Sequence, residues 1–108
     1  MGKIIYADHS ATTYVKDEVI KEMLPFFTLN YGNPSSAYSI GRASKEAVEK
    51  ARIKVAKAIG AESNEIYFTA GGSESDNMII KGIARANKTK GKHIITTKIE
   101  HLAVLNTC

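Results

Sequence analysis

A glycine-rich turn is the stretch of this sequence whose residue types best suit ligand chemistry. Gly71-Gly72-Ser73 follows a short β-type run and precedes an amphipathic segment. Such a turn offers free backbone N–H groups, a hydroxyl and the positive end of a helix dipole, which together suit a phosphate group. It is neither a Walker motif nor a Gly-x-Gly-x-x-Gly fingerprint. The alternative is a plain strand-to-helix turn, with Ser73 as N-cap and Asp76 completing a capping box.

His101 is the second candidate, because it follows another β-type run and opens a short helical segment. An imidazole at that place could stack on a planar cofactor or move a proton near neutral pH. The plainer interpretation is a surface histidine ahead of a helix. His9 and His93 have no partner at metal-ligand spacing, so we predict structural roles for both and no metal site. Cys108, the single cysteine, has no context that would make it a nucleophile.

The segments that must position these residues alternate between helical and β-type patterns. The expected elements are a strand or extended arm over 4–7, a helix from an N-cap at Asp17 that Pro25 kinks or resets, a helix over 40–59 capped by Gly60, strands over 66–69 and 93–97, and a helix over 73–86. The Ala-rich apolar stripe of the 40–59 helix predicts core packing, with Glu46 and Lys50 as an ion pair. Strand, helix and strand in that order predict a parallel βαβ unit with a right-handed crossover. The chain therefore looks like the start of an α/β domain whose other strands are missing.

Composition and charge exclude several classes of protein. The 108 residues are 44% hydrophobic and 24% charged, which is typical of a globular chain. The net charge of +4 reflects an acid-free stretch between Asp76 and Glu100 that holds six basic residues. A nucleic-acid surface is the alternative there, but no accompanying motif supports it, so we interpret the stretch as a solvated face. No segment has the length of a transmembrane helix or a signal peptide, which favours a cytoplasmic protein without membrane contact.

Five ordered blocks of this sequence together resemble the cysteine desulfurases, pyridoxal-phosphate (PLP) enzymes of the class V aminotransferase group and fold type I. The blocks are Tyr6-Ala7-Asp8-His9-Ser10-Ala11-Thr12-Thr13, Tyr31-Gly32-Asn33-Pro34-Ser35-Ser36 with Gly41-Arg42, Phe68-Thr69-Ala70-Gly71-Gly72-Ser73-Glu74-Ser75-Asp76-Asn77, His93-Ile94-Ile95-Thr96-Thr97 and Ile99-Glu100-His101. They cover nearly the whole chain. The resemblance implies part of a three-layer α/β sandwich, with N-terminal helices and one βαβ unit.

The resemblance also implies roles for individual residues. Gly72 and Ser73 match the pair that holds the cofactor phosphate, although the family usually has Thr in place of Ser73. His101 matches the histidine that stacks on the pyridine ring and takes part in proton transfer. Tyr38 stands where the family often has a histidine, and His9 occupies a variable position, so neither receives a role. The Schiff-base lysine, the aspartate at the pyridine nitrogen and the persulfide-forming cysteine of the family have no counterparts here.

We therefore expect the N-terminal fragment of an enzyme that converts L-cysteine to L-alanine and passes the sulfur to an acceptor protein, for iron–sulfur clusters or thio-cofactors. Residues 1–60 would form an arm and helices, and residues 61–108 the start of the large PLP-binding domain. The parent would be a homodimer that does not bind nucleic acid, and the fragment alone would be inactive and would not retain PLP. The alternatives are a selenocysteine lyase or class V transaminase, a stand-alone phosphate- or anion-binding module, and an assembly subunit with a vestigial site.

Overall fold

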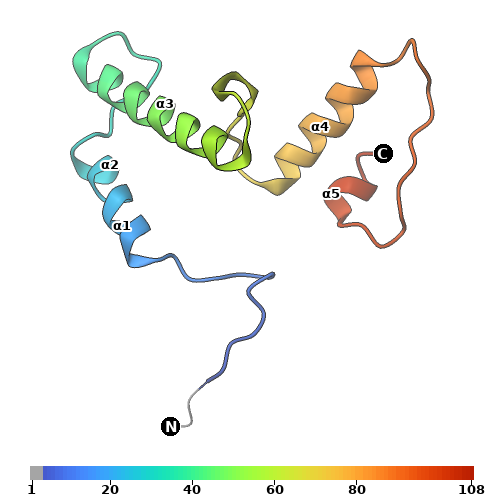
Figure 1. The fold of residues 1–108 in the computed structure, drawn as a ribbon, viewed down its shortest axis with the longest axis horizontal. Helices are drawn as coiled ribbons and strands as arrows, with labels where there is room; N and C mark the ends of the chain where they lie inside the picture. Colours follow the sequence, from blue (N-terminus) through green and yellow to red (C-terminus); the bar gives the residue numbers. More distant parts are fainter. Residues whose placement is uncertain (1–3) are drawn as a thin grey trace. The chain divides into compact units, whose positions relative to one another are not determined.

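The computed structural model describes residues 4–108, and all of its regular elements are helical (Figure 1). They are α1 (Asp17–Met23), α2 (Pro25–Thr28), α3 (Ser39–Ile59), the 3-10 helix η1 (Ser63–Glu65), α4 (Gly72–Ala86) and α5 (Leu102–Leu105). The chain divides into two compact units, Met1–Ile66 and Tyr67–Cys108, and each is described here by itself. The first three residues of the expected N-terminal arm lie outside the described residues.

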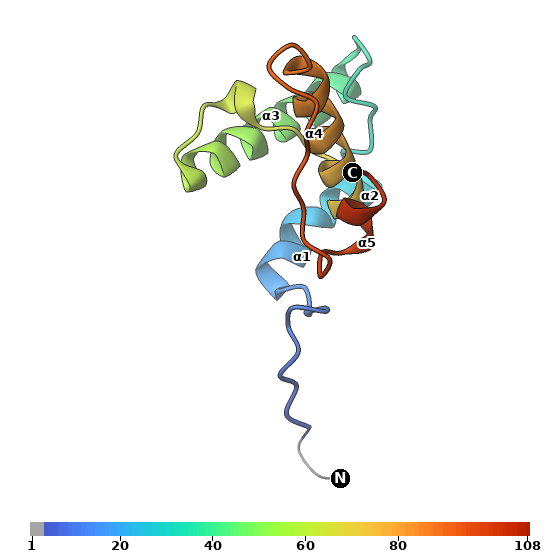
Figure 2. The same ribbon diagram turned by 90° about the vertical axis from the view of Figure 1, so that its right-hand side faces the viewer.

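The first helices form where the sequence predicts them, with one correction at the start of α1. Residues 4–16 reach α1 without regular structure (Figure 2). Asp17 is the first helical residue and not the N-cap, because Lys16 keeps an extended backbone ahead of it. Acidic side chains in the first turn suit the positive end of the helix dipole. Pro25 resets the helix as expected, since it begins α2 directly after Leu24.

The long helix α3 matches its predicted bounds and caps, but its predicted core face is wrong. Gly60 ends the helix in the left-handed conformation at φ 71°, and Glu46 pairs with Lys50 at 3.9 Å. The apolar stripe, however, leaves Val55 40% and Ile59 68% exposed. The residues of α3 that are buried are Gly41, Ser44 and Ala56. The stripe stays in water because no element among the described residues covers it.

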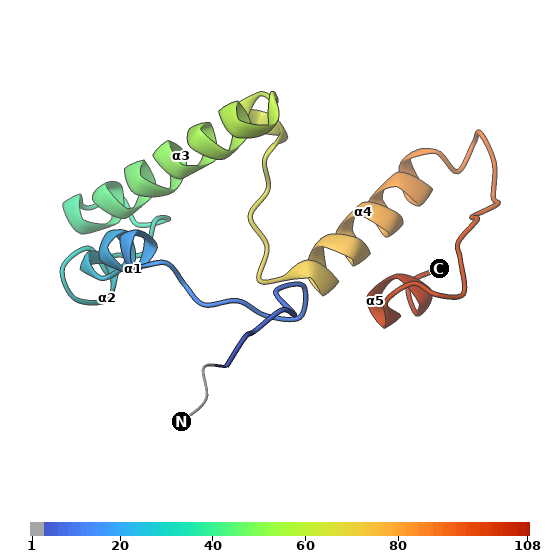
Figure 3. The same ribbon diagram turned by 60° about the horizontal axis from the view of Figure 1, so that its bottom comes forward.

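A loop packs tightly onto the start of α3, and we call residues 30–44 the α3 collar (Figure 3). Ser44 donates its hydroxyl to the carbonyl of Asn30 at 3.0 Å. A Cβ atom built on Gly41 would lie 2.5 Å from the carbonyl oxygen of Ser36 and 2.7 Å from that of Asn33. These are distances that real side chains do not adopt. The collar therefore closes only because a residue without a side chain stands at position 41.

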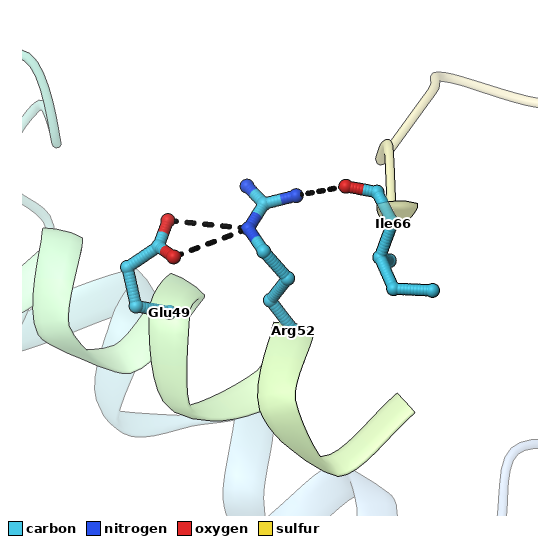
Figure 4. Close-up of polar contacts among 3 residues, drawn as sticks. All are labelled: Glu49, Arg52 and Ile66. Carbon is cyan, nitrogen blue, oxygen red and sulfur yellow. Dashed lines mark hydrogen bonds and ion pairs between the residues drawn. The ribbon is translucent and has the colours of Figure 1, made fainter. Parts of the chain in front are cut away.

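Arg52 ties the chain that follows α3 back to the helix (Figure 4). Its Nε lies 3.2 and 3.3 Å from the two carboxylate oxygens of Glu49, and its Nη1 donates to the carbonyl of Ile66. A reciprocal capping box between Glu62 and Glu65 shapes η1 on the way. Ile66 leaves this arrangement with an extended backbone, at φ −96° and ψ 125°.

The expected strands do not form in the described part of the chain. Residues 4–7, 66–69 and 93–97 are irregular, and Figure 1 shows the long path from α4 to α5 without an arrow. The βαβ unit and the sandwich are therefore absent from residues 4–108. A strand is stable only when a neighbouring strand accepts and donates its backbone hydrogen bonds, and no such neighbour is present in this stretch. The apolar side chains of 93–97 consequently face water, with Ile95 88% exposed.

The second unit consists of α4, α5 and the segment between them, and the two helices contact each other. α4 begins and ends within one residue of its predicted bounds, and α5 follows His101 as expected. None of the helices within residues 4–108 has the length and apolar character needed to cross a bilayer.

Candidate functional site

The start of α4 presents a set of unused hydrogen-bond donors. Gly71 is the N-cap, and Gly72 and Ser73 are the first two helical residues. The first helical hydrogen bond runs from the N–H of Ser75 to the carbonyl of Gly71 at 3.2 Å. Within residues 4–108, the N–H groups of Gly72, Ser73 and Glu74 and the hydroxyl of Ser73 bind no acceptor. An anion at this end of the helix would meet these donors and the positive end of the dipole.

The cap of α4 differs from the capping box that the sequence suggests. Ser73 is not the N-cap, because the helix begins one residue before it, and its carbonyl accepts from Asn77 Nδ2 at 2.9 Å. Glu74 supplies the reaching carboxylate in place of Asp76, and its Oε2 accepts the N–H of Ala70 at 2.6 Å. The signal for this contact is a Glu in the first turn of the helix, three residues after the true N-cap.

Two hydroxyls beside the turn are further residues that sequence reasoning missed. Thr69 Oγ1 and Ser75 Oγ lie 2.7 Å apart, and each is also near the carbonyl of Gly71. We call this pair the hydroxyl clamp. Its sequence signal is weak, because a Thr and a Ser six positions apart on either side of a turn are common.

The glycines of the turn are free of steric demands from this chain. A Cβ atom built on Gly71 or on Gly72 would meet nothing within 4 Å. Gly71 has φ 169°, which is extended backbone that any residue adopts. Space therefore remains open above the uncommitted donors of the α4 N-terminus.

His101 is the N-cap of α5, and its side chain takes part in the cap. Its Nδ1 accepts the backbone N–H of Ala103 at 3.1 Å. A neutral imidazole that accepts at Nδ1 carries its proton at Nε2, so this contact sets the tautomer. The ring is exposed. In the part of the chain that the structure describes, no hydrogen bond joins His101 to Gly72 or Ser73.

Two hollows lie in the second unit, and neither contains the predicted site residues. One, of about 590 Å³, runs along the apolar side of α4 and the chain after it, from Ile79 to Ile94. The other, of about 430 Å³, lies between α4 and the segment before α5 and includes Asp76 and Glu100. Both are largely faces of α4 that no other element covers.

The remaining residues singled out by the sequence take part in local structure or stand apart. His9 Nδ1 lies 3.0 Å from Thr13 Oγ1, and its ring meets the Tyr6 ring edge-on at 5.1 Å between centroids. Tyr6 also donates to the carbonyl of Asp8 at 2.9 Å, so the first block closes into a turn. Cys108 is an exposed free thiol. Among the described residues, no group of three His, Cys, Asp or Glu side chains could hold a metal ion.

Comparison with known proteins places the chain in context. The aminotransferase class-V family model matches residues 5–108. Cysteine desulfurase IscS of Clostridium botulinum is 65% identical over 107 residues, which are 99% of this chain and 27% of that protein. The protein of the same name from Methanosarcina thermophila is 64% identical over 99% of this chain and 26% of its own length. Among solved structures, a NifS-like protein matches with a TM-score of 0.85 and 47% identity, over 93% of this chain and 28% of its own. The chain thus spans about a quarter of the length of these relatives.

Proposed function

Because the chain belongs to the aminotransferase class-V family, we propose that it forms the N-terminal part of a PLP-dependent cysteine desulfurase. The full enzyme would convert L-cysteine to L-alanine and transfer the sulfur to an acceptor protein for iron–sulfur cluster or thio-cofactor assembly. The observation that carries this proposal is the 65% identity to a cysteine desulfurase along 99% of the chain. Residues 1–108 alone would be inactive, since the lysine, aspartate and cysteine that the chemistry needs would come from the rest of the enzyme.

The residues at the start of α4 fit the phosphate group of PLP. Uncommitted N–H groups at Gly72 and Ser73, a free hydroxyl at Ser73 and open space above both glycines form a suitable set of donors. The one nearby carboxylate, Glu74, is occupied by the N–H of Ala70. Gly72 and Ser73 would therefore hold the phosphate through charge-assisted hydrogen bonds.

His101 would act on the ring side of the cofactor. When bound, PLP supplies an electron sink that weakens bonds at the α-carbon of an amino acid. The Nδ1 of His101 is held by Ala103, so the ring orientation is fixed locally and Nε2 is left to hold or move a proton. The exposed ring face would stack on the cofactor.

The larger architecture is part of the same proposal. Residues 1–60 would form the arm and helices, and residues 61–108 the start of the PLP-binding domain. The segments 66–69 and 93–97 would become strands of a three-layer α/β sandwich when later strands of the enzyme lie beside them. The exposed apolar residues of 93–97 and the bare stripe of α3 support this, because both need a covering element. The enzyme would act as a cytoplasmic homodimer.

The test is cysteine-dependent release of sulfide and alanine by the full-length protein loaded with PLP. His101→Ala should lower the turnover at least about a hundredfold, which is typical for the loss of a proton-transferring group. Gly72→Asp should empty the enzyme of PLP, because its carboxylate would repel the phosphate. His93→Ala removes another exposed imidazole of the same unit and should leave the rate unchanged. A wild-type protein that releases no sulfide from cysteine, or a His101→Ala variant at the normal rate, would contradict the assignment.

A further inference from the structure

The hydroxyl clamp, Thr69 and Ser75, converges on one atom of the turn before α4. Thr69 Oγ1 lies 3.3 Å and Ser75 Oγ 3.4 Å from the carbonyl oxygen of Gly71, and the two hydroxyls are 2.7 Å apart. The N–H of Ser75 donates to the same carbonyl at 3.2 Å. Both side chains are less exposed than their neighbours at positions 70–74.

Counting protons shows that this arrangement always satisfies the Gly71 carbonyl. Two hydroxyls bring two protons, and the short contact between them uses one. Whichever hydroxyl donates in that contact, the other keeps its proton for the Gly71 oxygen. A carbonyl oxygen has two lone pairs, so one takes the N–H of Ser75 and the other takes a hydroxyl. The carbonyl of Gly71 is therefore held from two directions.

Holding this carbonyl also orients the donor proposed for the phosphate. The carbonyl of Gly71 and the N–H of Gly72 belong to the same planar trans peptide unit and point in opposite directions. Packing does not fix this unit, because a Cβ atom at either glycine would meet nothing within 4 Å. Glycine is also the residue that loses most freedom when its backbone is ordered. The clamp is thus the contact that keeps the Gly72 N–H in one direction.

We propose, on the basis of the function proposed above, that Thr69 and Ser75 are positioning residues of the phosphate site. They do not contact the ligand in this account. They pre-order the Gly71–Gly72 peptide, so that the Gly72 N–H meets the phosphate without first losing conformational freedom.

The experiment compares the dissociation constants of PLP and of pyridoxal, which lacks the phosphate, for the full-length apoprotein. The Thr69→Val/Ser75→Ala double variant should weaken PLP about tenfold and pyridoxal less than twofold, as expected for losing the order of one charge-assisted hydrogen bond. Each single variant should weaken PLP only about two- to threefold, because the remaining hydroxyl still reaches Gly71. Thr69→Ser and Ser75→Thr keep the hydroxyls and should bind PLP as the wild type does. Thr107→Val removes a comparable hydroxyl bond, to the carbonyl of Ala103 at 2.7 Å, and should change neither constant.

The possible results separate this proposal from the proposed function. Equal weakening of PLP and pyridoxal by the double variant, or a lower melting temperature with an unchanged ratio of the two constants, would make the clamp merely structural and overturn the proposal. If the double variant does not fold, the comparison of Ser75→Ala with Ser75→Thr decides, since only the first should change the ratio. A wild-type protein that binds pyridoxal as tightly as PLP would overturn the phosphate site itself, and the clamp with it. A wild type that prefers PLP but is inactive on cysteine would overturn the desulfurase assignment and leave the clamp to be judged by the ratio.

Discussion

The α3 collar and the start of α4 both place a glycine in the first turn of a helix, for opposite reasons. At Gly41, carbonyl oxygens of Asn33 and Ser36 occupy the space that a side chain would need. At Gly72, that space is empty within 4 Å. The first glycine is explained by the chain itself. The second has no internal explanation, which is what a surface that receives a ligand requires.

The strongest test of this difference is Gly41→Ala in the full-length protein. Alanine favours a helix by up to about 1 kcal/mol over glycine. Here the new Cβ would lie 2.5 Å from a backbone oxygen, so the collar must open. Overpacking typically costs about 1–3 kcal/mol, and we expect a net loss of about 2 kcal/mol in the free energy of unfolding, measured by urea denaturation. An unchanged stability would show that the collar is looser than described.

A smaller effect is expected from Ser44→Ala, which removes a polar contact of the collar without adding volume. The buried Ser44 hydroxyl donates to the carbonyl of Asn30 at 3.0 Å, and its loss leaves that carbonyl without this partner. The free energy of unfolding should fall by about 1 kcal/mol. Ser63→Ala, at a half-buried serine outside the collar, is the matched control and should change stability by less. Equal effects of the two substitutions would contradict a special role for the collar.

The smallest effect is expected from Gly72→Ala, the same change as in the first test at the other glycine. The added methyl meets no atom of this chain, so stability should stay within about 0.5 kcal/mol of wild type or rise slightly. PLP affinity should also remain within about twofold, because a methyl group removes no donor. A large loss of stability would reveal a neighbour from the rest of the enzyme at this place, and the comparison with Gly41 would fail.

Sequence patterns predict the helices well, because helices satisfy their own hydrogen bonds. The 40–59 periodicity and Gly60 specify α3, and the turn at Gly71 specifies the start of α4 to within one residue. Strands at 66–69 and 93–97 are not found, since their partners are not local in sequence. The predicted core stripe of α3 fails for the same reason, because a face becomes a core only when something covers it. The roles of Gly72, Ser73 and His101 remain predictions. The hydroxyl clamp was missed because Thr69 and Ser75 meet only through the geometry of the turn.

The scarcity of buried apolar groups has a consequence for calorimetry. Among the described residues, Ala56 is the one buried hydrophobic side chain, at 3% exposure. The heat-capacity increment of unfolding grows with the apolar surface that becomes wet, and here most of that surface is wet already. Melting of this stretch by itself would therefore produce a broad transition with almost no step in heat capacity. The step measured for a full desulfurase would be generated where α3, α4 and the 93–97 segment meet the remainder of the polypeptide.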